Sequence, residues 1–286
     1  MIAVTGANGQ LGQLVINELL KRTSKENIIA LVRNPENAGT FSEQGIQVRH
    51  ADYNRTDTLK SALKGVEKLL LISGSEIGQR TAQHKAVISA AKQAGVALLA
   101  YTSLLNTDTS SMLLSAEHKE TEAAIRASGL PAVILRNGWY NENYTGNLDA
   151  VLANKAVVGA GGKGKITPAA RLDYAEAAAV VLTSESSHAG KVYELAGDHA
   201  FTQADYATEI ANQTKQDIAY KVLNKTDYQG LLVQIGLPEG FAQMLADSDA
   251  QMIKGDLFDD SHTLSQLIGR PTTSIKTSIK QALTRA

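Results

Sequence analysis

The sequence predicts an α/β protein with a Rossmann-type, doubly wound parallel sheet and a smaller, mostly helical C-terminal substrate domain. A short apolar segment at residues 1–4 runs into a glycine-rich turn at residues 5–12 and then into a helical pattern. Apolar segments of strand length then alternate with helical segments up to residue 136. Beyond residue 145 this alternation stops, which indicates a second kind of structure.

The glycine-rich turn has the spacing Gly6-x-x-Gly9-x-x-Gly12. Asn8 stands where the dinucleotide fingerprint has its second glycine, and no Lys-Ser/Thr pair follows Gly12, which excludes a P-loop. Glycines here allow a tight turn, a close backbone approach to a pyrophosphate, and close packing of the helix. The free N–H groups at the start of the helix favour a diphosphate, although a glycine turn without a ligand is the alternative. The expected cofactor contacts are Gly6, Ala7, Asn8, Gly9, Gln10, Leu11 and Gly12.

The remaining elements of the sheet domain follow in order. Apolar segments bounded by Gly, Pro, Asn and Ser predict the later strands, at residues 27–33, 45–53, 66–72, 96–101 and 131–136. Helical patterns, closed by Gly65, Gly95 and Gly129 where they end, predict the helices between them, at residues 13–20, 56–63, 79–94 and 113–129.

Arg33 ends the second predicted strand, about 20 residues past the glycine turn, where the dinucleotide fold selects its cofactor. A carboxylate at this point accepts hydrogen bonds from the ribose of NAD(H) and would repel a 2′-phosphate. A guanidinium can bind that phosphate and stack on adenine. Arg33 therefore predicts NADPH as the cofactor, with a solvated arginine at a strand end as the alternative.

Small or polar residues follow the other strands. Ser73, Gly74 and Ser75 would let a cofactor lie against the backbone, and Ser103 ends the fifth strand. Because ligands bind beyond the carboxyl ends of parallel strands, these residues should share one rim with Gly9 and Arg33. Asp52, at the end of the third strand, either meets the adenine amino group or caps the next helix.

The sixth predicted strand runs into an aromatic and amide-rich segment that holds the only tryptophan of the chain. Such side chains would suit a flat ring, either nicotinamide or substrate. The alternative is a packed loop that anchors the next helix. The expected cofactor contacts in this segment are Asn137, Gly138, Trp139 and Tyr140.

The C-terminal half is expected to close the substrate cleft. It contains a flexible glycine loop at residues 159–164, as a lid or a plain connector, and an alanine-rich helix at residues 173–182. A short strand at residues 192–195 is followed from residue 202 by helices, with one strand near residues 218–223 and a last helix at residues 274–283. We expect an NADP-binding domain at residues 1–145, to which residues 167–200 return, and a discontinuous substrate-binding domain at residues 146–286.

Composition excludes several classes. Lys and Arg number 28 against 29 Asp and Glu, which argues against a nucleic-acid or anionic-membrane binder. The absence of cysteine excludes disulfides, thiolate nucleophiles and Cys-based metal sites. His84, His118 and His199 lie on separate predicted elements, so satisfied surface histidines are expected and no metal site. With no signal-peptide pattern and no membrane-spanning apolar run, we expect a cytoplasmic protein, as a monomer or homodimer.

Several segments together resemble the NmrA-like group of atypical short-chain dehydrogenases over essentially the whole chain. They are the Thr5-Gly6-Ala7 turn with its later glycines, Arg33, the segment Leu135-Arg136-Asn137-Gly138-Trp139-Tyr140-x-Glu142-Asn143, and Asp173-Tyr174-Ala175. Within that group the bacterial NADPH-dependent quinone oxidoreductases are most similar. The resemblance implies a Rossmann-type cofactor domain, a small substrate domain, NADPH, and hydride transfer to a quinone.

One departure bears on the chemistry. Short-chain dehydrogenases that act on alcohols place a Tyr four residues before a Lys, but here Ser115 precedes Lys119. A serine hydroxyl is a poor proton donor, which puts ordinary carbonyl reduction in doubt. A quinone needs less help, because hydride addition gives a stable hydroquinone anion. Lys119 either orients the nicotinamide ribose or is an exposed helix lysine; Lys119 and Tyr140 are the catalytic candidates.

Two functions from different classes therefore remain open. The first is NADPH-dependent reduction of a quinone. The second is an NADP(H)-binding redox sensor that acts through a protein partner without turnover, as NmrA-like proteins include such members. A sugar-nucleotide epimerase shares the fold but normally keeps the Tyr/Lys pair, and it ranks last. The aromatic segment around Trp139 and Tyr140 favours the first.

Overall fold

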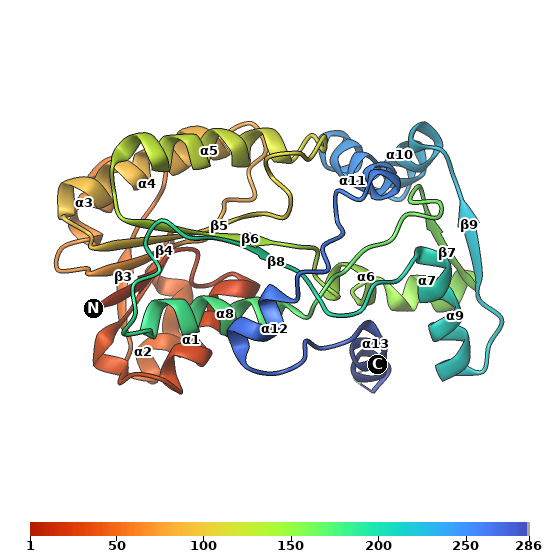
Figure 1. Cartoon of the computed structure of the whole chain (residues 1–286), viewed down its shortest axis with the longest axis horizontal. Coiled ribbons are helices and arrows are strands. Elements are labelled where there is room, and N and C mark those ends of the chain that lie inside the picture. Colours follow the sequence, from red (N-terminus) through yellow and green to blue (C-terminus); the bar gives the residue numbers. More distant parts are fainter. Residues whose placement is uncertain (285–286) are drawn as a thin grey trace. The chain divides into compact units, whose positions relative to one another are not determined.

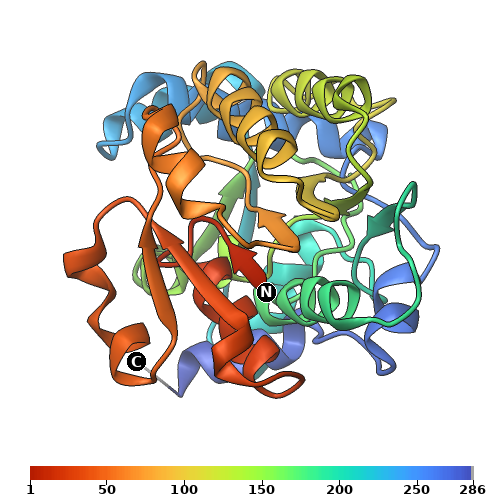
Figure 2. The same ribbon diagram turned by 90° about the vertical axis from the view of Figure 1, so that its left-hand side faces the viewer.

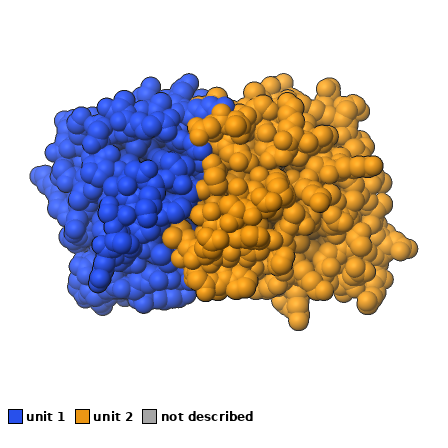
Figure 3. Space-filling view, in the orientation of Figure 1, with its two compact units in different colours: residues 1–104, 117–136, 172–193 blue, residues 105–116, 137–171, 194–286 orange. Residues whose placement is uncertain are grey.

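The computed structural model describes residues 1–284. The chain divides into two compact units, coloured separately in Figure 3. Unit 1 comprises residues 1–104, 117–136 and 172–193, and unit 2 comprises residues 105–116, 137–171 and 194–286. Each unit is built from three segments, so neither is one continuous stretch of sequence.

Unit 1 is built on a seven-stranded sheet of order β3-β2-β1-β4-β5-β6-β8 (Figure 1). Its strands are β1 (Ile2–Val4), β2 (Ile28–Val32), β3 (Gln47–His50), β4 (Lys68–Leu71), β5 (Leu98–Leu104), β6 (Ala132–Asn137) and β8 (Val192–Leu195). β1 pairs in parallel with both β2 and β4, and the pairs β2–β3 and β4–β5 are also parallel. The strand order reverses between β1 and β4, as in doubly wound folds, which confirms the predicted fold class.

Helices cover both faces of this sheet. Figures 1 and 2 show α3, α4 and α5 on one face and α1, α2 and α8 on the other. These helices are α1 (Gln10–Leu20), α2 (Gly39–Glu43), α3 (Thr56–Ala62), α4 (Arg80–Ala94), α5 (Ser115–Ser128) and α8 (Arg171–Thr183). Strands covered on both faces are mostly apolar, and every residue of β1, β2 and β5 is buried, including the polar Thr102 and Ser103 near the end of β5.

The helix ends follow the local sequence. α4 is followed by Gly95 at φ +71° and α5 by Gly129 at φ +72°, the left-handed conformation that glycine adopts without a steric penalty. α1 begins at Gln10, three residues earlier than predicted, so the helix starts within the glycine turn itself. Leu11, Val15 and Leu19 form its buried face.

Unit 2 contains the remaining elements and a second, two-stranded parallel sheet. They are α6 (Glu142–Thr145), α7 (Leu148–Asn154), β7 (Ala156–Gly159), α9 (Gln203–Thr214), β9 (Ala219–Val222), α10 (Lys225–Gln234), α11 (Glu239–Gln251), α12 (Thr263–Ile268) and α13 (Ile275–Leu283). Short 3-10 turns are η1 (Lys25–Asn27) and η2 (Pro35–Ala38) in unit 1 and η3 (Met252–Lys254) in unit 2. The helices after residue 202 and the strand near 218–223 match the prediction, but β7, the partner of β9, was not predicted.

The glycine loop at residues 159–164 is packed, so the expectation of a flexible loop is wrong. A Cβ added at Gly159, Gly161 or Gly164 would come under 3.0 Å from Gln203 or Met252. Gly161 N also donates to Gln203 Oε1 at 3.1 Å. These glycines serve close packing, and the segment is a connector rather than a lid.

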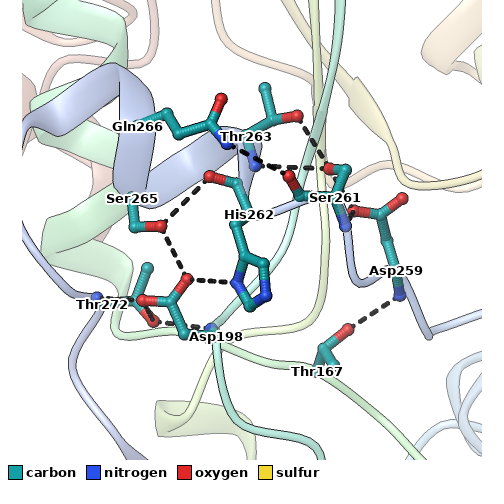
Figure 4. A network of polar contacts seen from close by, with 9 residues as sticks. All are labelled: Thr167, Asp198, Asp259, Ser261, His262, Thr263, Ser265, Gln266 and Thr272. Carbon is teal, nitrogen blue, oxygen red and sulfur yellow. Dashed lines mark hydrogen bonds and ion pairs between the residues drawn. The ribbon is translucent and has the colours of Figure 1, made fainter.

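A carboxylate network in unit 2 joins the loop of Asp198 to the start of α12 and to the loop that follows α12 (Figure 4). Asp198 accepts hydrogen bonds from Ser265 Oγ at 2.7 Å, His262 Nδ1 at 3.0 Å, and Thr272 N at 2.7 Å. Burial alone would raise the pKa of Asp198, but these hydrogen bonds outweigh it and lower the pKa to about 2. Asp198 therefore stays ionised in its folded surroundings across the neutral range.

No helix within residues 1–284 combines the length and the apolar character needed to cross a membrane.

Candidate functional site

The glycine turn after β1 has the shape that a phosphate loop needs. Gly6 lies at φ +58°, and Gly9 N donates to Gly6 O at 2.9 Å, which closes the turn. A Cβ at Gly12 would collide with Gly6 O and would lie 2.8 Å from Ala7 Cα. Gly6 thus supplies the left-handed conformation, and Gly12 lets α1 pack directly against the turn.

The start of α1 is open to an anion. Gly9 is its N-cap, no side chain caps the helix, and its first turn carries no acidic residue. Gly6, Gly9 and Gln10 are exposed, whereas Ala7 and Leu11 are buried. Uncapped N–H groups with the helix dipole behind them bind a diphosphate well, so the turn fits the predicted cofactor.

Thr5 and Tyr53 brace this turn, a role that the sequence analysis did not detect. Thr5 Oγ1 accepts hydrogen bonds from Tyr53 OH at 2.5 Å and from Ile72 N at 2.9 Å. Burial raises the pKa of the Tyr53 phenol, so it keeps its proton for this contact. The hydroxyl of Thr5 therefore ties the ends of β1 and β4 together.

The rim residues of β2 and β3 differ in their contacts. The Arg33 side chain is 67% exposed, and its Nη1 lies 2.8 Å from Glu76 Oε1. Asp52 accepts a hydrogen bond from Asn54 N at 2.9 Å, while α3 begins at Thr56 without a side-chain cap. The helix-cap interpretation of Asp52 is therefore wrong, and its contact with adenine stays a prediction.

Hydrogen bonds with side chains of α4 and β5 hold residues 73–75 in place. Gly74 N donates to His84 Nε2 at 2.9 Å, and Gly74 O accepts from Arg80 Nε at 2.7 Å. Ser73 N donates to Thr102 Oγ1 at 2.9 Å. Burial, helped by the charge of Arg80, lowers the pKa of His84 to about 3, so His84 remains a neutral acceptor. Both peptide groups that would meet a cofactor at Gly74 are thus fixed in orientation.

Two histidines of unit 1 are buried, which corrects the expectation of surface histidines. His84 is fully buried, with Nδ1 3.0 Å from Thr121 Oγ1, and His118 Nδ1 lies 2.7 Å from Tyr101 OH. Burial holds the pKa of His118 well below its usual range. His199 is exposed as expected. Nothing in residues 1–284 brings three or more His, Cys, Asp or Glu side chains together as metal ligands.

Ser103, at the end of β5, is tied into a buried ionic network. Its Oγ donates to Glu122 Oε1 at 2.6 Å, and Glu122 also pairs with Arg136, whose Nη2 lies 2.7 Å from Oε2. Glu122 and Arg136 are both buried. The arginine of the Leu-Arg-Asn-Gly segment therefore stabilises the sheet. Lys119, on α5, is half-buried and its catalytic role stays a prediction.

In unit 2, the aromatic segment combines half-buried rings with buried anchoring residues. Asn141 is buried and donates to Thr273 O at 2.9 Å and Ser278 Oγ at 3.0 Å. Glu142 accepts from Arg171 N at the start of α8, through both oxygens. Trp139 and Tyr140 are half-buried. The end of the segment is thus an anchor, and the cofactor contacts expected at its beginning stay predictions.

Tyr140 has an unusual environment. The Arg171 guanidinium lies 4.7 Å from the centre of its ring. Burial raises the pKa of the phenol, and a hydrogen bond from Asn137 and the charge of Arg171 partly offset this. Asn137 Oδ1 is buried and has no hydrogen-bond partner among the described residues. An amide oxygen in that state favours a ligand that brings an N–H group.

Ser115 is turned inward. Its Oγ donates to Met112 O at 2.7 Å and Ser110 O at 3.1 Å, and its side chain is buried. The hydroxyl caps its own turn, and its proton is not directed at a ligand.

The sheet order, the glycine turn and the open start of α1 together define a Rossmann-type nucleotide-binding protein. A family model described as NAD(P)H-binding matches residues 6–185, and the chain belongs to this NAD(P)H-binding family. Quinone oxidoreductase 2 of Escherichia coli K12 is 53% identical over 279 residues, 98% of this chain and 97% of that protein.

Solved structures agree with this assignment. An NADPH-dependent quinone oxidoreductase from Escherichia coli in complex with NADPH superposes with a TM-score of 0.96 at 53% identity, over 99% of this chain and 100% of that one. The triphenylmethane reductase of Citrobacter sp. in complex with NADP(H) gives a TM-score of 0.94 at 38% identity, over 99% of this chain and 100% of that one.

Proposed function

We propose that this protein is an NADPH-dependent quinone oxidoreductase that reduces a quinone to the hydroquinone by transfer of a hydride. The observation that carries the proposal is the 53% identity, over 98% of the chain, to a quinone oxidoreductase whose structure holds NADPH. The geometry supports it independently, because the turn after β1 offers an uncapped helix start to a diphosphate.

Individual cofactor contacts are proposals from the chemistry of each residue. Backbone N–H groups of the turn from Gly6 to Gly12 would hold the pyrophosphate, and Arg33 would hold the 2′-phosphate that distinguishes NADPH from NADH. The fixed peptides at Ser73, Gly74 and Ser75 would carry the cofactor against the backbone. Lys119 would orient the nicotinamide ribose.

The contacts proposed for unit 2 are argued from the burial and the hydrogen bonds of each residue. The unpartnered Asn137 Oδ1 suits a carboxamide or similar N–H donor. The half-buried rings of Trp139 and Tyr140 suit a flat ligand ring. Gly138 N donates to Leu195 O at 2.8 Å, and this hydrogen bond fixes the backbone between Asn137 and Trp139.

Proton supply is simple in this proposal. When bound, NADPH supplies the hydride. The acceptor quinone becomes a hydroquinone anion, and one proton from water completes the two-electron reduction. Ser103, at the end of β5, donates to Glu122, and Ser115, at the start of α5, donates to its own turn, so neither presents its proton to a substrate. The site then works mainly by binding and orientation, and the catalytic role of Tyr140 stays a prediction.

Steady-state oxidation of NADPH by p-benzoquinone, with hydroquinone measured as product, tests the proposal. We expect turnover with NADPH, weaker use of NADH, and one hydroquinone per NADPH. An NADP(H)-binding sensor would instead bind the cofactor in an equilibrium titration and show no turnover with benzoquinone, naphthoquinone or menadione. That outcome would replace the enzyme proposal with the regulatory one.

The cellular location and the oligomeric state are also proposals. We propose a cytoplasmic location and a homodimer as the assembly. Sedimentation equilibrium measures the assembly directly, and a monomer at all protein concentrations would overturn the second expectation.

A further inference from the structure

Arg33 is paired with a carboxylate of the same unit. Its Nη1 lies 2.8 Å from Glu76 Oε1. Arg33 follows β2 and Glu76 follows β4, and these are the two strands on either side of β1. Because the glycine turn follows β1, the ion pair joins the two rim segments that flank the phosphate loop.

Glu76 is held in this position rather than free to swing. Its second oxygen, Oε2, accepts a hydrogen bond from Gln83 Nε2 at 2.7 Å. Gln83 is itself buried, on α4. The carboxylate is therefore fixed between a buried amide on one side and the Arg33 guanidinium on the other.

The backbone around Glu76 is also fixed. Two residues earlier, Gly74 is held by His84 and Arg80. Two residues later, Gly78 N donates to Glu117 Oε1 at 3.1 Å, and the other oxygen of Glu117 pairs with Arg80 at 2.9 Å. An ordinary surface pair loses side-chain entropy from both partners when it forms, but here the contact with Gln83 already orders the Glu76 carboxylate.

We infer that Glu76 is a specificity-determining residue: its carboxylate competes with the 2′-phosphate of the cofactor for Arg33. The inference rests on the proposed role of Arg33. A 2′-phosphate must share or displace a carboxylate that already occupies one guanidinium nitrogen, and it meets the negative charge of Glu76 at close range. A ribose with a free 2′-hydroxyl meets no such repulsion, and its hydroxyl can donate to the carboxylate. Glu76 thus reduces the preference for NADPH over NADH that Arg33 creates.

Two adenosine fragments separate this effect from the rest of the cofactor. 2′,5′-ADP carries the 2′-phosphate and 5′-AMP does not, and both can be titrated calorimetrically without turnover. In Glu76→Gln we expect 2′,5′-ADP to bind roughly two- to fivefold tighter, the range of an exposed ion pair, and 5′-AMP to bind unchanged. The ratio of the dissociation constants of NADH and NADPH should rise by the same factor.

A matched control removes one negative charge elsewhere in unit 1. Glu43→Gln, on the exposed end of α2, should leave the affinities for 2′,5′-ADP and 5′-AMP unchanged. In the Arg33→Gln background the gain from Glu76→Gln should fall by at least half, because the competition acts through Arg33. No change in Glu76→Gln, an equal gain for 5′-AMP, or an equal gain in Glu43→Gln would overturn the inference.

The Arg33 variant by itself separates the two levels of the proposal. If Arg33→Gln weakens both fragments equally, Arg33 does not hold the 2′-phosphate, and its assignment fails together with the role of Glu76. If Arg33→Gln weakens only 2′,5′-ADP while Glu76→Gln has no effect, the Arg33 assignment stands and the inference on Glu76 alone is wrong.

Discussion

Ser103 Oγ lies 2.6 Å from Glu122 Oε1, and this hydrogen bond draws the hydroxyl at the end of β5 into a buried ion pair with Arg136. A serine at the carboxyl end of this strand stands at the rim where ligands bind. Here its proton is committed to a carboxylate inside unit 1. The contact joins the hydroxyl at this strand end to the ion pair that stabilises the sheet.

Glu122→Gln should destabilise the protein. The change leaves the buried Arg136 guanidinium without its counter-charge, and breaking a buried pair in this way costs about 3 kcal/mol. Urea unfolding followed by circular dichroism gives the free energy of unfolding. Glu120→Gln, at an exposed position on the same helix, is the control and should change it by less than about 0.5 kcal/mol. Equal effects of the two variants would contradict the structural role of the network.

The glycines of the turn should separate binding from folding. Gly9→Val should abolish NADPH binding while the protein stays folded, since its Cβ would lie 3.1 Å from Gly6 O and would crowd the approach of the pyrophosphate. Gly12→Ala should instead lower the thermal midpoint, because its Cβ would collide with backbone atoms of Gly6 and Ala7. Fluorescence titration with NADPH and thermal unfolding of both variants check this. Wild-type affinity in Gly9→Val would show that the turn is not the site.

Ser115→Ala should leave quinone turnover nearly unchanged. The hydroxyl donates to Met112 O and Ser110 O within its own turn, and the hydroquinone anion takes its proton from water. A positioned acid is typically worth ~10²–10⁴ in rate when an alkoxide forms, so turnover of a simple aldehyde should be slight in both proteins. Steady-state rates with benzoquinone and an aldehyde provide the measurement. A hundredfold loss with benzoquinone would identify Ser115 as the proton donor after all.

Stability should fall with acid in a way that depends on Asp198. Its folded pKa of about 2 lies below the unfolded value of 3.8, so its contribution is complete above about pH 5 and is lost as the pH falls toward 2. The size of the shift corresponds to about 2 kcal/mol. The difference in free energy of unfolding between wild type and Asp198→Asn should therefore shrink between pH 5 and pH 3. A difference that stays constant over this range would contradict the assignment.

Most of unit 1 could be predicted because its signals are local. The strand, turn and helix at residues 1–20 carry their own pattern, and Gly95 and Gly129 end α4 and α5 where the sequence places them. Unit 2 was harder. β7 is a four-residue segment that pairs with β9, sixty-three residues further on by their first residues, 156 and 219. No local pattern predicts a strand whose partner lies so far away.

The contacts that shape the candidate site could not be predicted from the sequence either. His84 and Arg80 fix Gly74 from α4, and Glu76 meets Arg33 across the end of β1. Each pair joins residues on different elements, and a histidine on a helix has the same sequence signature whether it is buried or exposed. The glycine loop at residues 159–164 failed for a related reason: glycine allows flexibility and close packing alike, and only the neighbours Gln203 and Met252 decide between them.

Single-turnover reduction of p-benzoquinone with NADPH that carries deuterium at C4 tests whether the bound cofactor gives its hydride to the quinone. We expect one C4 stereoisomer to react slowly and to give NADP+ without deuterium, and the other to react at the normal rate and to give NADP+ that retains the deuterium. The proposal would be contradicted if both stereoisomers of NADPH bind to the protein and the quinone oxidises neither.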